Sequence, residues 1–237
     1  MRYIFVHIPK TAGTSLFDAM MQQFGAHNIL PQYGHRPPPD SWWEGAKEKA
    51  LTGIRKQVWP HRYVVGHVPV VQYMDIQEDG RYTKRPGYRY MTFLRNPLDR
   101  AVSHYFYWQQ INEPQNPQWV RFHTEQWSLE QFLLHPKFTN FHMRFIRGLD
   151  IDEFDFVGVV EEFEQSMKLL GRMFPEFNKM EVLQSRKTKF KNTDSIANLP
   201  QRVMDEFHQL HRNDYVAYER ARQRVLRQSE EYMFKIS

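Results

Sequence analysis

The chain has 237 residues, and its 41% hydrophobic and 25% charged content is typical of a soluble globular protein that fits in one domain, residues 1–237. It contains no cysteine, which excludes disulfides, thiolate metal sites and cysteine nucleophiles. The formal net charge of +5 suits an anionic ligand, but the basic excess is too diffuse to indicate a nucleic-acid partner.

Apolar runs alternate with helical patterns along the chain. In order, they predict a strand over residues 3–6, helices over 16–24 and 41–51, strands over 62–65 and 88–94, helices over 98–110, 128–135 and 139–147, a strand over 156–160, a helix over 162–174, a short edge strand at 181–183, and helical residues from 200 to 235 with a break near 213. The stretches 26–40, 77–87 and 112–118 are expected to be loops. This alternation predicts an α/β fold, a P-loop-like three-layer arrangement with a central parallel sheet flanked by helices.

The apolar runs are all far shorter than a bilayer-spanning helix, and no signal-peptide pattern precedes the first strand. Together with the absence of cysteine, this predicts a cytoplasmic protein with no membrane span. The basic excess also favours an acidic substrate, although a highly anionic co-substrate would account for it equally well.

Two of the predicted helices begin at recognisable capping signals. Ser15 and Asp18 have the spacing of a capping box at the start of the first helix. Asn96 is suited to cap the helix that follows the strand at 88–94, and Pro97 is suited to its first position. Both helices are therefore expected to start a short distance after a strand ends.

The loop His7–Ser15 joins the first strand to the first helix and consists largely of small residues. Backbone N–H groups at such a junction converge on one point, backed by the positive end of the helix dipole, and this favours a phosphate-like anion. Lys10 adds a mobile positive charge. The loop is not a Walker A motif, because Lys10 precedes Gly13, the only glycine of the stretch. The alternative is a tight turn with a solvated lysine.

Two further constellations follow predicted strands. Arg95 ends the strand at 88–94 and Ser103 lies eight residues later, so a guanidinium fork and a hydroxyl are placed to hold a second phosphate. The alternative there is an ordinary surface arginine. His67 follows the strand at 62–65, where α/β folds place catalytic groups, and an imidazole suits a general base. A lone histidine is more often structural, however, and this chain has 11.

These motifs resemble those of a known family. The run from His7 to Leu16 resembles the 5′-phosphosulfate-binding loop of carbohydrate sulfotransferases, the heparan sulfate 2-O-sulfotransferase group in particular, and the chain is similar to a bacterial-type soluble member. Residues 93–103 resemble the family's 3′-phosphate-binding segment, residues 157–163 a later strand and helix, and residues 185–188 a loop that closes over the nucleotide. The family uses 3′-phosphoadenosine 5′-phosphosulfate (PAPS) as the sulfuryl donor, and chemistry of this type needs no metal.

The resemblance implies a role for each matching residue. Lys10 and His67 are the expected catalytic residues, with Lys10 stabilising the leaving phosphate and His67 acting as the base. The relatives tend to carry a second histidine two positions before this base, where this chain has Val65. The expected donor-binding residues are Lys10, Thr11, Ala12, Gly13, Thr14, Ser15, Arg95, Ser103, Ser185, Arg186, Lys187 and Thr188.

The expected function is transfer of a sulfuryl group from PAPS to a hydroxyl of a saccharide or glycan acceptor. Three alternatives remain open: a sulfotransferase that acts on a lipid or small-metabolite hydroxyl, a nucleotide-dependent kinase with an unusual P-loop, and a non-catalytic module that binds anionic glycans. The kinase would require Mg²⁺ and ATP, whereas the binding module would transfer no group at all.

Overall fold

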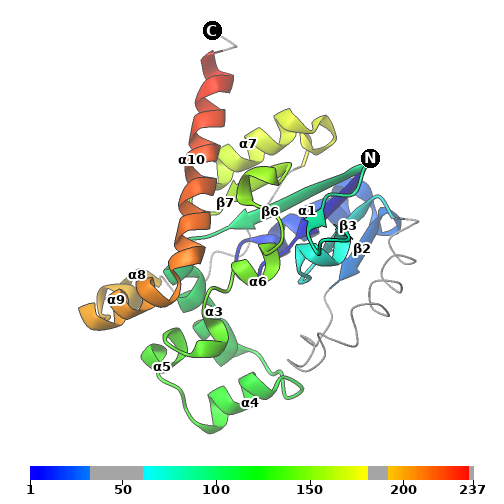
Figure 1. Ribbon diagram of the computed structural model, residues 1–237. Helices are drawn as coiled ribbons and strands as arrows, with labels where there is room; N and C mark the ends of the chain where they lie inside the picture. The colour runs from blue at the N-terminus through cyan, green and yellow to red at the C-terminus, as the bar shows by residue number, and fades with distance from the viewer. Residues whose placement is uncertain (33–60, 181–191, 235–237) are drawn as a thin grey trace.

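A five-stranded parallel sheet lies at the centre of the molecule (Figure 1). The computed structural model describes residues 1–32, 61–180 and 192–234. The strand order is β2-β3-β1-β6-β7, and every neighbouring pair is parallel. The strands span Arg2–Val6 (β1), Ile29–Gln32 (β2), Tyr63–Gly66 (β3), Tyr88–Leu94 (β6) and Phe156–Val159 (β7). The predicted α/β fold with a central parallel sheet is confirmed.

Helices flank this sheet and extend beyond one end of it. They span Gly13–Phe24 (α1), Pro97–Gln110 (α3), Pro117–Thr124 (α4), Leu129–Leu133 (α5), Met143–Ile146 (α6), Phe163–Met173 (α7), Asn192–Ala197 (α8), Gln201–Leu210 (α9) and Arg212–Phe234 (α10). A small antiparallel hairpin, β4 (Asp75–Ile76) and β5 (Tyr82–Thr83), lies outside the central sheet. Within the described ranges, no helix is long and apolar enough to cross a bilayer.

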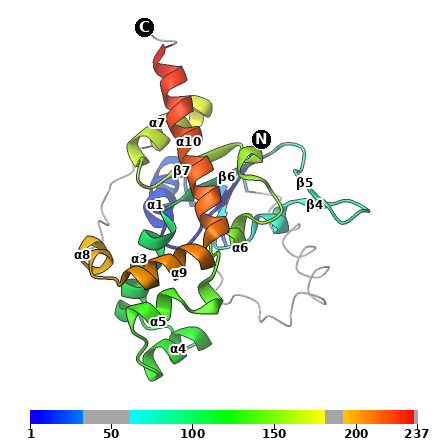
Figure 2. The ribbon, with the colours of Figure 1, turned by 60° about the vertical axis from the view of Figure 1, so that its left-hand side comes forward.

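Both faces of the sheet are covered, which explains why most residues of its strands are apolar and do not alternate regularly with polar ones. Tyr3 and Phe5 of β1 belong to the core on the side of α1 and α7. Ile4 and Val6 belong to the core on the opposite side, where α10 packs. Figures 1 and 2 show the sheet between these helices, with α4, α5, α8 and α9 gathered at one end of the molecule. The predicted three layers are therefore present.

Helix α3 starts directly after β6 and is capped as its sequence indicates. The Asn96 side chain accepts hydrogen bonds from the N–H groups of Leu98 (3.0 Å) and Asp99 (3.3 Å), and Pro97 occupies the first helical position. The N–H of Asn96 donates to the Glu161 carboxylate at 2.9 Å. This contact joins the start of α3 to the segment after β7.

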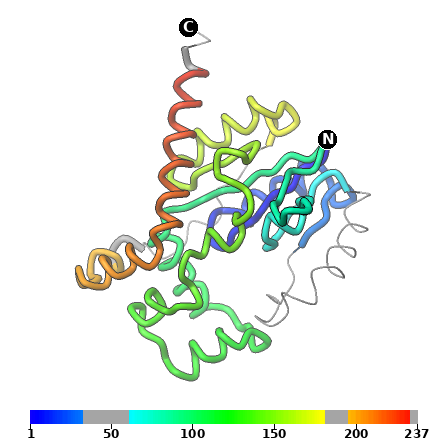
Figure 3. Tube along the Cα trace, in the orientation of Figure 1, coloured from blue at the N-terminus to red at the C-terminus, as the bar shows by residue number. Residues whose placement is uncertain are grey.

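Helix α10 is fixed by arginines to the segment that precedes β7. Arg224 donates to the carbonyl oxygens of Ile151 (3.0 Å) and Phe154 (2.9 Å). Arg220 forms an ion pair with Asp150 at 2.7 Å. Figure 3 follows the chain from its N-terminus at the start of β1 to its C-terminus beyond α10. The last helix is thereby held against the sheet by polar contacts as well as by apolar packing.

The start of α1 differs from the prediction. The helix begins at Gly13, three residues before the expected Leu16, and its N-cap residue is Ala12. The capping box expected between Ser15 and Asp18 is therefore wrong, because Ser15 already lies in the first helical turn. The physical reason is the left-handed backbone of Ala12, which turns the chain into the helix early.

Short elements also form where loops were predicted. β2 contains Pro31, which is tolerated because β2 is an edge strand. β5 lies within a polar surface stretch, and α4 begins after an Asn116 cap. The helix predicted over 41–51 and the edge strand predicted at 181–183 lie outside the described residues.

Candidate active site

The loops that follow β1, β3 and β6 meet at one edge of the sheet, because parallel strands place their carboxyl ends together. Val6 pairs with Gly66 in the register between β1 and β3, so His7 and His67 begin neighbouring loops. The N–H of His7 donates to the carbonyl of Gly66 at 2.9 Å, and the N–H of His67 donates to the carbonyl of Gln32 at 3.0 Å. The sheet therefore fixes the backbone of both histidines.

The loop after β1 forms a tight turn with two residues in the left-handed region. Lys10 has a φ of 72° and Ala12 a φ of 61°, which residues other than glycine seldom adopt. Thr11 is buried between them, and both its hydroxyl (2.8 Å) and its N–H (3.3 Å) donate to the carbonyl of Ile8. Backbone strain of this kind clusters at ligand sites, and alternating conformations turn successive N–H groups to one side.

Helix α1 begins in this turn without a capping side chain from the described residues. The N–H of Leu16 donates to the carbonyl of Ala12 at 3.2 Å. The preceding N–H groups of Gly13, Thr14 and Ser15 have no acceptor within the helix and lie at the positive end of its dipole. Together with the turn they form an anion cradle. The residues expected to hold the 5′-phosphosulfate therefore lie in the turn after β1 and in the first turn of α1.

Lys10 connects this cradle to β6 and α3. Its Nζ lies 4.1 Å from the centre of the Tyr107 ring, a cation–π contact. Its carbonyl oxygen accepts a hydrogen bond from Nη1 of Arg95 at 3.4 Å. Burial lowers the pKa of Arg95, and Asp99 and Glu161 oppose the effect, so the guanidinium stays charged. The two cations expected to face the donor are therefore brought together.

Ser103 lies on α3, about two turns after Arg95, and is 1% exposed. Its hydroxyl oxygen is buried and has no hydrogen-bond partner among the described residues. A buried hydroxyl in this state is uncommon and costs about 1–3 kcal/mol. A phosphate group beside Ser103 would accept this hydrogen bond and remove the cost.

His67 is exposed at the surface of the site, and its ring lies 4.5 Å from the buried ring of His7 at an interplanar angle of 56°. Although part of the side chain reaches solvent, the surrounding protein lowers the pKa of His67 to about 4. Burial, and then His67 and Lys10, hold the pKa of His7 well below its ordinary value. Both imidazoles are therefore neutral at neutral pH, and His67 has a lone pair with which to accept a proton.

The position expected for a second histidine, Val65, is fully buried in the core beneath α1. His7 instead places a second imidazole beside His67. The sequence holds a clue to this pairing, since each of two predicted strands is followed closely by a histidine. Recognising it requires the knowledge that the two strands are neighbours in the sheet.

The remaining donor-binding residues predicted from the sequence are not placed. Ser185, Arg186, Lys187 and Thr188 lie outside the described residues, and their contribution stays a prediction. In the part of the chain that the structure describes, no group of three or more histidine or carboxylate side chains is arranged to hold a metal ion.

Beneath the site, α3 carries a second buried cation, Arg100, which is 1% exposed. Its guanidinium lies 4.1 Å over the Phe141 ring, and its Nη1 is 3.5 Å from Nδ1 of His104. Nε and Nη2 have no hydrogen-bond partner within the described ranges. Burial lowers the pKa of Arg100 to about 9, and nearby Asp214 opposes this shift. Nothing in the sequence marks Arg100, because an arginine in a mixed helical pattern resembles a solvated one.

Asp214, near the start of α10, is the buried counter-charge. Its carboxylate accepts hydrogen bonds from the N–H groups of His142 and Met143, both at 3.0 Å, while its own N–H donates to the Asn140 side chain at 3.3 Å. Burial alone would raise the pKa of Asp214, but His142, His211 and the two N–H donors outweigh it and lower the pKa. We call this reciprocal arrangement the Asp214 clasp. It ties α10 to the start of α6.

The free energy of unfolding is expected to fall as the pH falls from about 6.5 towards 4. His142 is fully buried, and burial lowers its pKa to about 4. Burial also lowers the pKa of His7 and His104. In the unfolded chain these imidazoles have ordinary pKa values near 6.5, so the unfolded state binds more protons in this interval. His142 alone contributes a loss of about 3 kcal/mol once the pH is below its folded pKa.

Urea unfolding near neutral pH and at two lower values within this interval measures the effect. The His142→Phe variant, which keeps a buried ring but removes the titratable group, is expected to show a shallower dependence on pH. A wild-type unfolding free energy that does not change across the interval would contradict the expectation.

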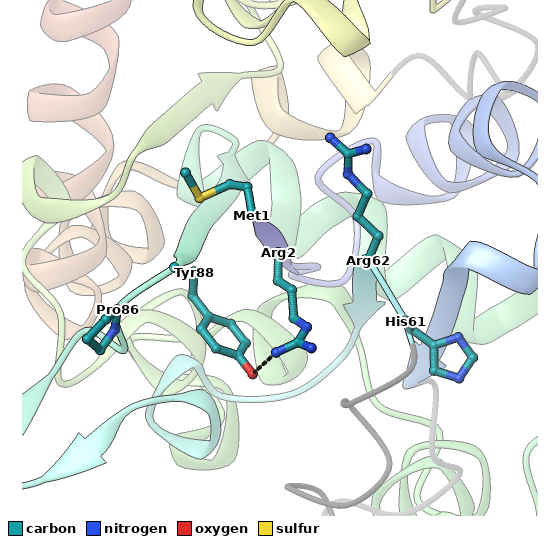
Figure 4. A pocket seen from close by; sticks show the side chains of 7 residues that line it. Met1, Arg2, His61, Arg62, Pro86 and Tyr88 are labelled. Carbon is teal, nitrogen blue, oxygen red and sulfur yellow. Dashed lines mark hydrogen bonds between the residues drawn. The ribbon is translucent and has the colours of Figure 1, made fainter.

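A separate open pocket of about 440 Å³ lies at the opposite, amino edge of the sheet (Figure 4). It is lined by Met1, Arg2, His61, Arg62, Pro86, Gly87 and Tyr88. Nη1 of Arg2 donates to the Tyr88 hydroxyl at 3.4 Å, and Arg62 pairs with Glu176 at 3.0 Å. Since the strands are parallel, the length of the sheet separates this pocket from the carboxyl-edge loops. The pocket is not part of the candidate site.

A parallel central sheet with a tight turn and a helix start after its first strand, and further cations at the same edge, is the arrangement typical of phosphate-binding α/β proteins. A model of the sulfotransferase family matches residues 2–219, and the chain belongs to this family. The chain is therefore a sulfotransferase.

Two solved structures are similar to the chain. Mouse sulfotransferase SULT7A1 complexed with PAP is 14% identical, with a TM-score of 0.44 over 88% of this chain and 82% of that one. A sulfotransferase from Alicyclobacillus acidocaldarius is 16% identical, with a TM-score of 0.40 over 92% of this chain and 94% of that one. No curated protein sequence is significantly similar to the chain.

Proposed function

We propose that this sulfotransferase moves a sulfuryl group from PAPS to a hydroxyl group of a saccharide acceptor. The observation that carries the proposal is the meeting, at one sheet edge, of an anion cradle, Lys10 and neutral His67, with Arg95 and Ser103 beside them. Each part has a counterpart in the reaction, which needs two phosphate sites, a charge at the leaving group and a base.

The donor is proposed to lie across the start of α1 and α3. Lys10 and the N–H groups of residues 12–15 would hold the 5′-phosphosulfate, while Thr11, whose N–H and hydroxyl both donate to the carbonyl of Ile8, would shape the turn. Arg95 and Ser103 would hold the 3′-phosphate, with Arg95 supplying a fork of donors and Ser103 the buried hydroxyl that lacks a partner. The hydrogen bond from Arg95 to the carbonyl of Lys10 keeps the two phosphate sites in a fixed relation.

His67 is proposed to accept the proton of the acceptor hydroxyl. As the acceptor oxygen forms its bond to sulfur, the bond between sulfur and the 5′-phosphate oxygen breaks, and that oxygen keeps the electron pair. Lys10 and the cradle N–H groups stabilise the negative charge that develops there. The products are a sulfate ester and adenosine 3′,5′-bisphosphate (PAP), and the proton remains on the imidazole of His67.

The saccharide acceptor is supported by the motif resemblance, and the net charge of +5 favours an acidic one. The test is transfer of radiolabelled sulfate from PAPS, in EDTA, to a panel of acidic saccharides, neutral saccharides, lipid hydroxyls and small alcohols. A labelled saccharide is the expected product. Labelling of lipid or small-molecule hydroxyls alone would show that the acceptor is not a saccharide. PAP binding without transfer to any acceptor would indicate a glycan-binding module.

Replacing Arg95 with alanine is expected to weaken PAP binding by ~10–100-fold, because a charge-assisted hydrogen bond to phosphate contributes about 1.5–3 kcal/mol. Isothermal titration with PAP measures the change. Arg81→Ala is the matched control, because Arg81 is exposed on the β4–β5 hairpin and pairs with Asp79. Equal PAP affinity in wild type and Arg95→Ala would remove Arg95 from the donor site.

Replacing Ser103 with alanine is expected to weaken PAP binding while leaving the melting temperature of the free protein unchanged or raised. The reason is that the buried hydroxyl lacks a partner among the described residues, so its removal relieves a desolvation cost. Thermal unfolding with and without PAP separates the two effects. A variant that melts earlier without PAP and binds PAP normally would assign Ser103 to structure alone.

A further inference from the structure

His7 ends the first strand, and the mechanism above gives its side chain no task. We propose that His7 is a positioning residue, whose ring holds the imidazole of His67 in the orientation needed to take the acceptor proton. The inference deepens the proposed function and rests on it for the role of His67.

The two side chains are in direct contact. Their ring centres are 4.5 Å apart and the ring planes are tilted by 56°, so the exposed imidazole lies against the buried one. His7 is 4% exposed and cannot itself meet a bulky acceptor. It is therefore placed to act on His67 and not on the substrate.

The backbone of His7 is held firmly enough for this role. Its N–H donates to the carbonyl of Gly66, the residue immediately before His67, at 2.9 Å. The preceding residue, Val6, pairs with Gly66 on one side and with Thr92 on the other. The His7 ring, attached at the end of the central strand β1, thus supports the His67 ring, attached just after the neighbouring strand β3.

Gly13 provides the space that the His7 ring occupies. A Cβ built on Gly13 would overlap the Cδ2 and Nε2 atoms of His7. Gly13 is the first residue of α1 and lies outside the left-handed region, so its backbone does not require glycine. The requirement comes instead from the imidazole beside it. His7 and Gly13 of the loop motif therefore form one unit, which joins the anion cradle to His67.

The charge state of the group suits this arrangement. Burial keeps both imidazoles neutral at neutral pH, so they do not repel each other. Lys10 also acts on His7, and His104 lies close enough to interact with both Lys10 and His67. A neutral, rigid neighbour orients His67 without competing for the proton that it is to receive.

The experiment follows the His67 imidazole directly, by NMR of ¹⁵N-histidine-labelled protein titrated with acid, and measures turnover in parallel. His7→Ala removes the supporting ring, and Gly13→Ala displaces it from the other side. In both variants the His67 resonances are expected to move, and the His67 pKa is expected to rise towards its ordinary value as water reaches the ring. His27→Ala is the control, because His27 is exposed and contacts Asn28.

Turnover adds a second criterion. His7→Ala is expected to lower kcat by about tenfold or more, to change the acceptor KM and the PAP affinity by less than about twofold, and to move the acid limb of the kcat profile to higher pH. A purely structural role for His7 would lower the melting temperature without moving that limb.

Failure of the inference and failure of the proposed function give different results. If His67→Ala loses activity but the His67 resonances and pKa are the same in wild type, His7→Ala and Gly13→Ala, the positioning role is wrong and the proposed function stands. If His67→Ala keeps wild-type turnover, the base assignment fails, and the positioning role for catalysis fails with it.

Discussion

Alanine in place of His67 is expected to lower kcat for sulfuryl transfer by ~10²–10⁴-fold, the usual contribution of a positioned general base. The affinity for PAP is expected to change by less than about twofold, because His67 follows β3, whereas the proposed phosphate-binding residues lie after β1, after β6 and on α3. Initial rates with labelled PAPS and titration with PAP measure the two quantities.

The pH dependence of the same reaction provides a check. Since burial lowers the pKa of His67 to about 4, the base is deprotonated throughout the neutral range, and kcat/KM is expected to fall only on the acid side of pH 6.5. That acid limb should be absent from the residual activity of the alanine variant. An unchanged limb would assign it to another group and would contradict the role of His67.

Alanine in place of Lys10 is expected to lower kcat by ~10²–10³-fold, because the charge that develops on the leaving phosphate loses its nearest mobile cation. The effect is expected in kcat more than in KM, since the cradle N–H groups still bind the donor. Single-turnover rates with PAPS separate the chemical step from product release.

Two further variants sharpen the Lys10 experiment. Lys10→Arg keeps the charge and the contact with the Tyr107 ring and is expected to recover part of the rate. Lys168→Ala, which removes an exposed lysine from α7, is expected to have no effect. A loss of rate in Lys10→Ala that is fully explained by weaker PAPS binding would show that Lys10 acts in binding alone.

Much of the fold follows from local sequence pattern. The strand predicted at 88–94 has the same bounds as β6, since a stretch of strand-forming residues ends shortly before a helix-capping asparagine and a proline. The break predicted near residue 213 lies close to the junction of α9 and α10 at His211. The placement of Lys10, Arg95 and His67 at one edge follows in turn, because each follows closely on a predicted strand.

Other features depend on contacts that sequence pattern does not reveal. β2 has four residues, one of them a proline, and exists through its pairing with β3. Helix α1 starts early because Ala12 adopts a left-handed backbone, for which its side chain gives no indication. The pairing of His7 with His67 and the burial of Arg100 need the order of the strands and the position of α10. These features depend on contacts between residues that are far apart in the sequence, and the pairing of His7 with His67 is the one proposed to affect catalysis.

The Asp214 clasp also affects when the site can form. Asp214 follows its two backbone hydrogen-bond donors, His142 and Met143, by 72 and 71 residues. During synthesis these contacts close only after α10 has been made, and contacts of such separation are slow to form. Until then Arg100 lacks its counter-charge beneath α3. A nascent or shortened chain that ends before α10 would contain Lys10 and His67 but would lack the Asp214 contacts beneath α3.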